Sequence, residues 1–159
     1  RRQRQMCIRD RYITTINLQC ASNKEVKKNY FSTEKNIVIK YKNHTRGYYK
    51  EYIFTKKRIK IYFNYQKTQF LEKNITSEMW QKCIDLVANL NLDEFKNLKS
   101  PSNLRQTDGV QHGELSLEIK DKNFKHTCYF DHGNPPAKVK DLVNYLLSIS
   151  DMDSIKNKL

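Results

Sequence analysis

Two short stretches of the sequence gather the residue types that could do chemistry. TDGVQHG contains Asp108 and His112, and FDHGNPP contains Asp131 and His132. Aspartate and histidine side chains within reach of each other can bind a metal ion or act as a general acid/base pair. The same residues are common in turns, where Asp131 would cap the next helix, the glycines would supply left-handed backbone and His112 would bond a carboxylate.

The two stretches are predicted to meet because the strands that carry them form a hairpin. GELSLEIK and NFKHTCYF each have apolar residues at alternate positions, and a turn at Asp121 and Lys122 joins them. In this register the apolar faces agree and His112 lies opposite Asp131. The four Asp and His residues therefore come to one end of the sheet.

We expect this polar cluster to be structural rather than catalytic. The chain has no HExxH, no G-x-S-x-G and no phosphate-binding loop, and no nucleophile stands in an activating motif. We therefore assign no catalytic residue, no metal ligand and no cofactor. The alternative is a metal-dependent hydrolase that uses Asp108, His112, Asp131 and His132. His44 falls in an expected loop and carries no signal.

The periodicity of the chain predicts an α+β domain with the element order β-β-β-α-β-β-α. Runs rich in Ile, Tyr and Phe predict three strands, SEMWQKCIDLVANLN predicts a helix, and a second helix extends from about Ala137 to Ser148. Hairpins combined with two helices indicate an antiparallel sheet of about five strands with both helices on one face. The predicted strands are 37–42, 48–55, 58–65, 113–120 and 123–130.

Cys83 and Cys128 both fall on faces that are predicted to be buried, one on a helix and one on a strand. They could meet where the helix packs on the sheet, and in an exported protein such a pair can form a disulfide. We expect two separate thiols instead, because free cysteine is among the residues most often buried.

The first eleven residues, RRQRQMCIRDR, differ in composition from everything that follows. They hold five arginines, whereas the rest of the chain holds three. The stretch from Met6 to Arg11 resembles a translated adapter used to tag DNA for sequencing, so we expect residues 1–11 to be an artefact. The alternative is a basic arm for nucleic acid. Without these residues, which also include one aspartate, the net charge falls from +13 to +9.

The remaining lysines are spread along the chain rather than clustered. In IVIKYK and RIKIYF they alternate with apolar residues, which places them on the solvent face of a strand. There is no Lys/Arg block and no aromatic and glycine signature of an RNA-binding sheet. We therefore expect no nucleic-acid partner, with a basic nucleic-acid-binding protein as the alternative. No apolar run approaches the ~20 residues that span a bilayer.

A short apolar stretch ends at Cys20 and is followed by a polar, lysine-rich segment. This is the pattern expected of a truncated signal peptide, and it resembles a bacterial lipoprotein signal in which Cys20 becomes acylated. Asn17, Leu18 and Gln19 depart from the usual aliphatic residue followed by two small ones. We expect a signal remnant and tether over 12–35, a single domain over 36–150 and a tail over 151–159.

The chain from about Gly47 to the final helix resembles a family of uncharacterised exported lipoprotein domains of Gram-negative bacteria. The DG-x-x-H motif of TDGVQHG and the FDHG-x-PP motif of FDHGNPP carry the resemblance. It implies one domain, held by a lipid anchor in the cell envelope and facing the periplasm or the cell surface, and it implies no catalytic residue. We therefore expect a non-enzymatic binding or structural module whose partner is a protein, a peptide or a cell-wall component.

Overall fold

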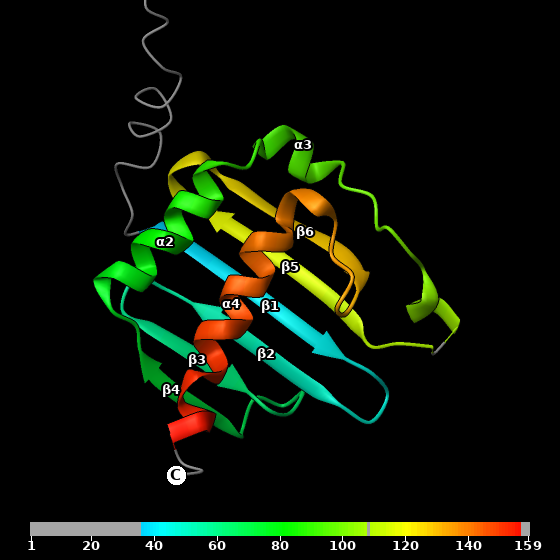
Figure 1. Ribbon diagram of the computed structural model, residues 1–159, viewed down its shortest axis with the longest axis horizontal. Helices are drawn as coiled ribbons and strands as arrows, with labels where there is room; N and C mark the ends of the chain where they lie inside the picture. Colours follow the sequence, from blue (N-terminus) through cyan, green and yellow to red (C-terminus); the bar gives the residue numbers. More distant parts are fainter. Residues whose placement is uncertain (1–35, 108, 157–159) are drawn as a thin grey trace, which may run out of the picture.

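The computed structural model describes residues 36–107 and 109–156, in which helices cover one face of a six-stranded antiparallel sheet (Figure 1). The spatial order of the strands is β4-β3-β2-β1-β5-β6. The predicted α+β class is confirmed, with one strand more than expected. The strands are β1 (Ile37–His44), β2 (Tyr49–Phe54), β3 (Arg58–Tyr62), β4 (Phe70–Asn74), β5 (His112–Ile119) and β6 (Phe124–Asp131). The helices are α2 (Ser77–Ala88), α3 (Leu92–Lys96) and α4 (Ala137–Lys156), with short 3-10 helices η2 (Leu104–Thr107) and η3 (Lys120–Lys122).

Strand β1 lies in the middle of the sheet and joins its two halves. On one side it pairs with β2, which continues through β3 to β4, and on the other side it pairs with β5. The pairing with β5 extends from Ile37 opposite Ile119 to His44 opposite His112. The N-terminal meander and the C-terminal hairpin are therefore one continuous sheet.

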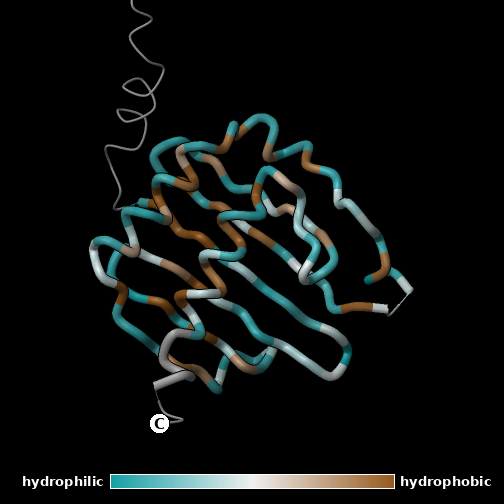
Figure 2. The backbone as a smooth tube through the Cα atoms, in the orientation of Figure 1, coloured by the Kyte–Doolittle hydropathy of each residue, from teal (hydrophilic) through white to brown (hydrophobic). Residues whose placement is uncertain are grey.

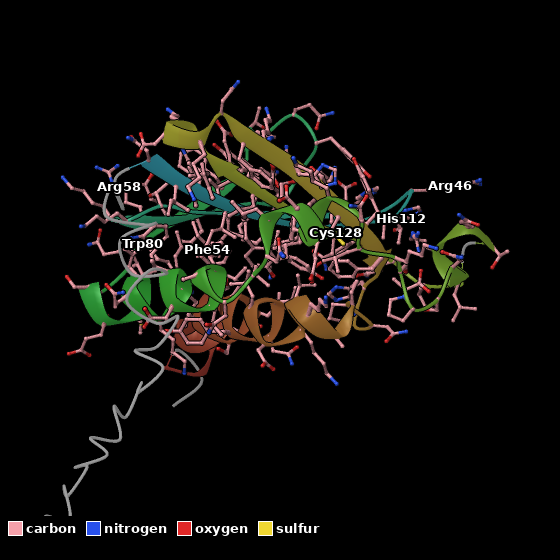
Figure 3. All side chains as sticks on the ribbon, turned by 90° about the horizontal axis from the view of Figure 1, so that it is seen from above. Arg46, Phe54, Arg58, Trp80, His112 and Cys128 are labelled. Atoms are coloured by element: carbon pink, nitrogen blue, oxygen red, sulfur yellow. The ribbon has the colours of Figure 1, made fainter. Side chains whose placement is uncertain are left out.

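The hydrophobic core lies between the sheet and the helices α2 and α4 (Figure 3). Alternate residues of β1 point into it, and Ile39 and Tyr41 are completely buried. In Figure 2, hydrophobic residues recur along the central strands and along both long helices, as expected when each element buries one face. The helices contribute Trp80, Cys83, Ile84, Val87, Val139, Leu142, Val143, Leu146 and Ile149 to the core.

Strand β4 was not predicted from the sequence. Its sequence FLEKN has no apolar alternation, because it lies at the edge of the sheet and both Phe70 and Leu71 are exposed. Pairing with β3 holds it there, supported by a hydrogen bond of 2.6 Å from Arg58 Nη1 to Glu72 Oε1 and by Lys60 over the ring of Phe70. Charged side chains along an exposed edge also disfavour pairing with other chains.

Helix α4 begins at Ala137 as predicted, but it continues to Lys156 rather than ending near Ser148. Ile149 and Ser150 are buried in the additional segment. Lys73 Nζ of β4 donates a hydrogen bond of 2.7 Å to the Ser150 carbonyl. Contact with the sheet therefore stabilises a segment whose own pattern gave no reason to extend the helix.

Cys83 and Cys128 are both free and buried, so no disulfide joins them. Burial raises the pKa of Cys83 to about 12. Burial also raises the pKa of Cys128, to about 11, although nearby Arg105 partly opposes the shift. Both thiols are therefore protonated at neutral pH and behave as small apolar side chains.

We predict that Ile39→Ala lowers the free energy of unfolding by about 2–5 kcal/mol, because Ile39 is completely buried in the central strand. The matched control is Lys40→Ala on the opposite face, where a 3.8 Å ion pair with Glu118 lies partly in solvent. That change should cost less than about 1 kcal/mol. Urea unfolding of both variants measures the difference, and equal losses would contradict the assignment of the buried face.

Candidate functional site

One end of the sheet brings together two of the predicted polar residues, His112 and Asp131, and one that was not predicted, His44. His44 of β1 lies opposite His112 of β5, which lies opposite Asp131 of β6. The predicted register of the β5–β6 hairpin is therefore confirmed. Asp108 lies outside the described residues.

Asp131 is the polar anchor of the loop that connects α3 to β5. Its Oδ2 accepts hydrogen bonds from the Ser102 hydroxyl at 2.6 Å and from the Leu104 amide at 2.8 Å. Its Oδ1 accepts from the Arg105 amide at 3.1 Å and from Arg105 Nη1 at 2.9 Å. The idea that Asp131 caps the final helix is wrong, because its carboxylate satisfies the amides that begin η2.

The loop sequence is suited to this arrangement because it supplies several donors within a few residues. Besides Asp131, Arg105 Nη1 contacts the Ser100 hydroxyl at 3.0 Å and the Ser102 carbonyl at 2.8 Å. Asn134 Nδ2 donates to the Ser102 hydroxyl at 2.8 Å, from the turn that follows β6. Polar contacts thus position a segment that has little apolar surface of its own.

The Asp131 carboxylate is ionised and has little remaining capacity for a ligand. Burial by itself would raise its pKa, but the hydrogen bonds from Ser102, Arg105 and Leu104 outweigh burial and hold the pKa well below its usual range. A carboxylate offers about four lone-pair positions, and the four bonds described above use them. Asp131 is therefore a structural group.

The glycines of the two motifs differ in what they contribute. Gly133 has φ 88° in the turn after β6, as predicted. Gly109 does not have left-handed backbone, contrary to the prediction, and its amide donates to the Leu104 carbonyl at 3.0 Å. Gly113 is needed for space, because a Cβ there would lie 2.9 Å from Cε2 of Phe130.

His132 does not join the other predicted residues, since its Nδ1 lies 2.6 Å from the Tyr41 hydroxyl. Burial lowers the pKa of His132 and thus favours its neutral form. Burial, and to a smaller degree the nearby Tyr52, raises the pKa of Tyr41, so its hydroxyl keeps its proton and donates to the neutral imidazole. This bond connects the end of β6 to the buried face of β1.

His112 stacks on His44, a residue to which the sequence assigned no role. The two imidazole rings are 4.9 Å apart and nearly parallel at 11°. His44 Nε2 donates a 2.8 Å hydrogen bond to Glu114 Oε1, and Lys42 Nζ lies 2.7 Å from Glu114 Oε2. A carboxylate can only accept, so this contact fixes the proton of His44 on Nε2.

An open pocket of about 620 Å³ lies beside the stacked histidines. Tyr65 forms one wall, with its hydroxyl donating to the Thr45 carbonyl at 2.8 Å and its ring 4.3 Å from that of Tyr49. Arg46 and His112 lie at the same end of the sheet (Figure 3). The lining residues are His44, Thr45, Arg46, Gly47, Tyr65, Val110 and His112. The sequence did not reveal this pocket, because its residues come from three separate segments.

The residues of the predicted cluster therefore have different roles. Asp131 holds a loop, His132 bonds Tyr41, and His112 lines the pocket. Within residues 36–107 and 109–156, no group of three or more His, Cys, Asp or Glu side chains is arranged to hold a metal ion. The arrangement at the pocket supports ligand binding by hydrogen bonds, charge and ring contacts.

The chain was compared with models of known protein families and with curated proteins, and neither comparison produced a match.

We predict that Asp131→Asn lowers the thermal unfolding midpoint by several degrees at pH 7, because the amide cannot accept all four hydrogen bonds. The loss should shrink at low pH. A carboxylate with a depressed pKa stabilises the fold above its unfolded-state pKa of about 4, and this contribution is lost as the pH falls.

The matched control for this prediction is Asp141→Asn on the exposed side of α4. Thermal unfolding of the parent and both variants at pH 7 and pH 2.5 is the measurement. A loss for Asp131→Asn that is no larger than the loss for Asp141→Asn would show that Asp131 does not anchor the loop.

Proposed function

We propose that this protein is a non-enzymatic binding module of the bacterial cell envelope, anchored to a membrane through acylated Cys20. Its partner is a protein, a peptide or a cell-wall component. The observation that supports binding is the pocket lined by Arg46, Tyr65, His44 and His112, which opens at the end of a rigid sheet. Its volume is typical of sites for small ligands or for short segments of larger ones.

Binding is favoured over metal-dependent hydrolysis by the contacts of the polar residues. A hydrolytic centre needs a nucleophile or an activated water beside a general base. Asp131 accepts four hydrogen bonds from the loop, and His132 bonds Tyr41. His112 is thus left in the pocket without a carboxylate partner among the described residues.

The charges on the uncovered face of the sheet favour a protein, peptide or cell-wall partner over nucleic acid. Several of its cations are paired with acidic neighbours: Lys42 with Glu114 at 2.7 Å, Lys40 with Glu118 at 3.8 Å, Arg58 with Glu72 at 2.6 Å, and Lys67 with Glu51. Affinity for nucleic acid comes mainly from cations that neutralise phosphates. Lysines that already neutralise carboxylates contribute less to such binding.

The envelope location is proposed from the sequence around Cys20, which lies outside the described residues. A short apolar stretch before the cysteine and a polar, lysine-rich segment after it are typical of a lipid-anchored chain. Of the helices in the described part of the chain, none is long and apolar enough to cross a bilayer. The domain begins at β1, which leaves the segment between Cys20 and Ile37 as the tether.

We predict that cells producing the full chain with its native leader incorporate a fatty-acid analogue into it, and that Cys20→Ala abolishes the label. The matched control is Cys83→Ala, which removes a buried thiol of the folded domain and should keep the label. Firm anchoring needs more than one acyl chain, so the parent should also resist extraction by salt. Label retained in Cys20→Ala would rule out this anchor.

Binding at the pocket can be tested with a photo-reactive amino acid at position 47. Gly47 is exposed at the pocket, and a Cβ there meets no atom within 4 Å. We expect illumination of cells to give a discrete adduct from position 47, and Arg46→Ala to weaken it.

The control position for cross-linking is Asp141, which is exposed on α4 and remote in sequence from the pocket residues. It should give no adduct of the same mass. An identical adduct from both positions, or none from position 47, would contradict the pocket as the binding site.

A further inference from the structure

We propose that Asn74 is a site of N-linked glycosylation. The acceptor sequence is Asn74-Ile75-Thr76, in which an asparagine is followed at the second position by a residue with a hydroxyl group. The substrate that modifies it is a sugar activated on a lipid-linked diphosphate, and the enzyme is a glycosyltransferase that acts on exported chains. The modification thus rests on the proposed envelope location, but it does not depend on the pocket.

The sequence contains two motifs of this kind, and the fold excludes the first of them. That motif is Asn43-His44-Thr45. Asn43 lies on the same face of β1 as Tyr41, is only 5% exposed, and donates a 3.1 Å hydrogen bond to Gln111 Oε1. A glycan on Asn43 would need space that packed side chains already fill.

Asn74 lies where the folded domain has room for a glycan. It is the last residue of β4, at the edge of the sheet, and lies opposite Arg58 of β3. Because Lys73 reaches the Ser150 carbonyl of α4, its neighbour Asn74 points to the uncovered face. The Asn74 side chain is exposed, and its amide has no hydrogen-bond partner among the described residues. A glycan there extends into solvent without displacing a packed side chain.

The neighbours of Asn74 determine when the glycan is added. Thr76 is exposed, but its hydroxyl accepts a 3.2 Å hydrogen bond from the Met79 amide at the start of α2. Ile75 lies between them and is buried in the core. The transferase must bind the hydroxyl as well as the amide, so it acts before β4 and α2 have docked. The domain then folds with the glycan on its surface.

The transfer forms one bond and breaks one bond. Nδ2 of Asn74 attacks the anomeric carbon of the sugar, and the bond between that carbon and the diphosphate oxygen breaks. The lipid diphosphate leaves with the bonding electron pair. The amide nitrogen has two protons and gives up one of them to a base of the enzyme. The product is a neutral glycosyl amide, so the step needs no oxidant or reductant.

A glycan at Asn74 is compatible with the proposed binding pocket. Arg58, which lies opposite Asn74, is at the other end of the sheet from Arg46 and His112 (Figure 3). The glycan therefore leaves the mouth of the pocket open.

The glycan would also protect the edge of the sheet. Strand β4 has one unpaired side, and on it Phe70 is 53% exposed and Leu71 is 45% exposed. Exposed strand edges with apolar side chains tend to pair with other chains. A bulky hydrophilic group on Asn74, in the same strand, hinders such pairing.

Mass spectrometry of the full chain from its native cells tests the site directly. Trypsin cleaves after Lys73 and Lys82, which releases residues 74–82 as one peptide. In protein recovered from the envelope fraction, we expect this peptide to carry the added mass of whole sugar residues, and fragmentation to place that mass on Asn74. Finding only the unmodified peptide in the envelope fraction would overturn the proposal.

Variants of the motif separate glycosylation from the capping role of Thr76. Thr76→Asp keeps a side chain that caps α2 but removes the hydroxyl, so it should fold and lose the glycan completely. Thr76→Ser keeps both groups and should retain the glycan, whereas Asn74→Gln should lose it. Thr45→Ala removes the other motif without changing Asn43, and should retain the glycan. A glycan that persists in Thr76→Asp or in Asn74→Gln would exclude Asn74 as the acceptor.

The glycan and the lipid anchor can be measured on the same protein, so the two proposals can fail independently. A fatty-acid label on Cys20 with no sugar on Asn74 would leave the anchored module standing and overturn glycosylation. A sugar on Asn74 with no label on Cys20 would support glycosylation and contradict the anchor.

Discussion

The pairing of β1 with β5 is the interaction on which the rest of the structure depends. It joins residues about 75 positions apart along the whole length of β1, from Ile37 opposite Ile119 to His44 opposite His112. Without it the N-terminal meander and the C-terminal hairpin would be two separate sheets, and an isolated two-stranded hairpin is marginally stable at best. With it, the residues of β1 and β5 that face α2 and α4 form one core. The same pairing brings the two stacked histidines together, so both the core and the pocket depend on it.

The hydrogen bonds to Asp131 at the edge of the sheet are a second constraint on the fold. The loop after α3 has few buried apolar side chains, and the Asp131 carboxylate holds it through Ser102, Leu104 and Arg105. Buried donors and acceptors must be satisfied, so a single ionised carboxylate can determine the path of several residues. The path matters for the site, because this loop leads to Val110 and His112 at the pocket.

The two faces of the sheet have different roles. One face is apolar and covered by the helices, while the other carries paired charges and leads to the pocket at its end. Such a division places the pocket where β1, β2 and β5 meet their loops. Loops on a rigid scaffold are where binding residues are commonly found. The proposed binding function is consistent with this arrangement, in which the rigid sheet positions the pocket residues at the ends of its strands.

Local patterns in the sequence were sufficient for the β5–β6 hairpin and for the two long helices that line the core. The alternation in β5 and β6 and the short turn between them predicted the register that places His112 opposite Asp131, because a one-residue slip would expose every buried side chain. The helical spacing around Trp80 and Leu142 likewise predicted which helix faces are buried.

Four features could be seen only in the tertiary structure: strand β4, the hydrogen-bond donors to Asp131, the extension of α4 and the neighbours of His44. Strand β4 has no apolar alternation because it lies at an exposed edge, and Asp131 binds groups 26 to 29 residues earlier in the chain. No sequence pattern indicated a role for His44, because its partner His112 is distant in sequence. Periodicity and turn chemistry report the burial of neighbouring residues along the chain. The choice of distant strand partners depends instead on how the whole chain buries its apolar surface, and no local pattern encodes that choice.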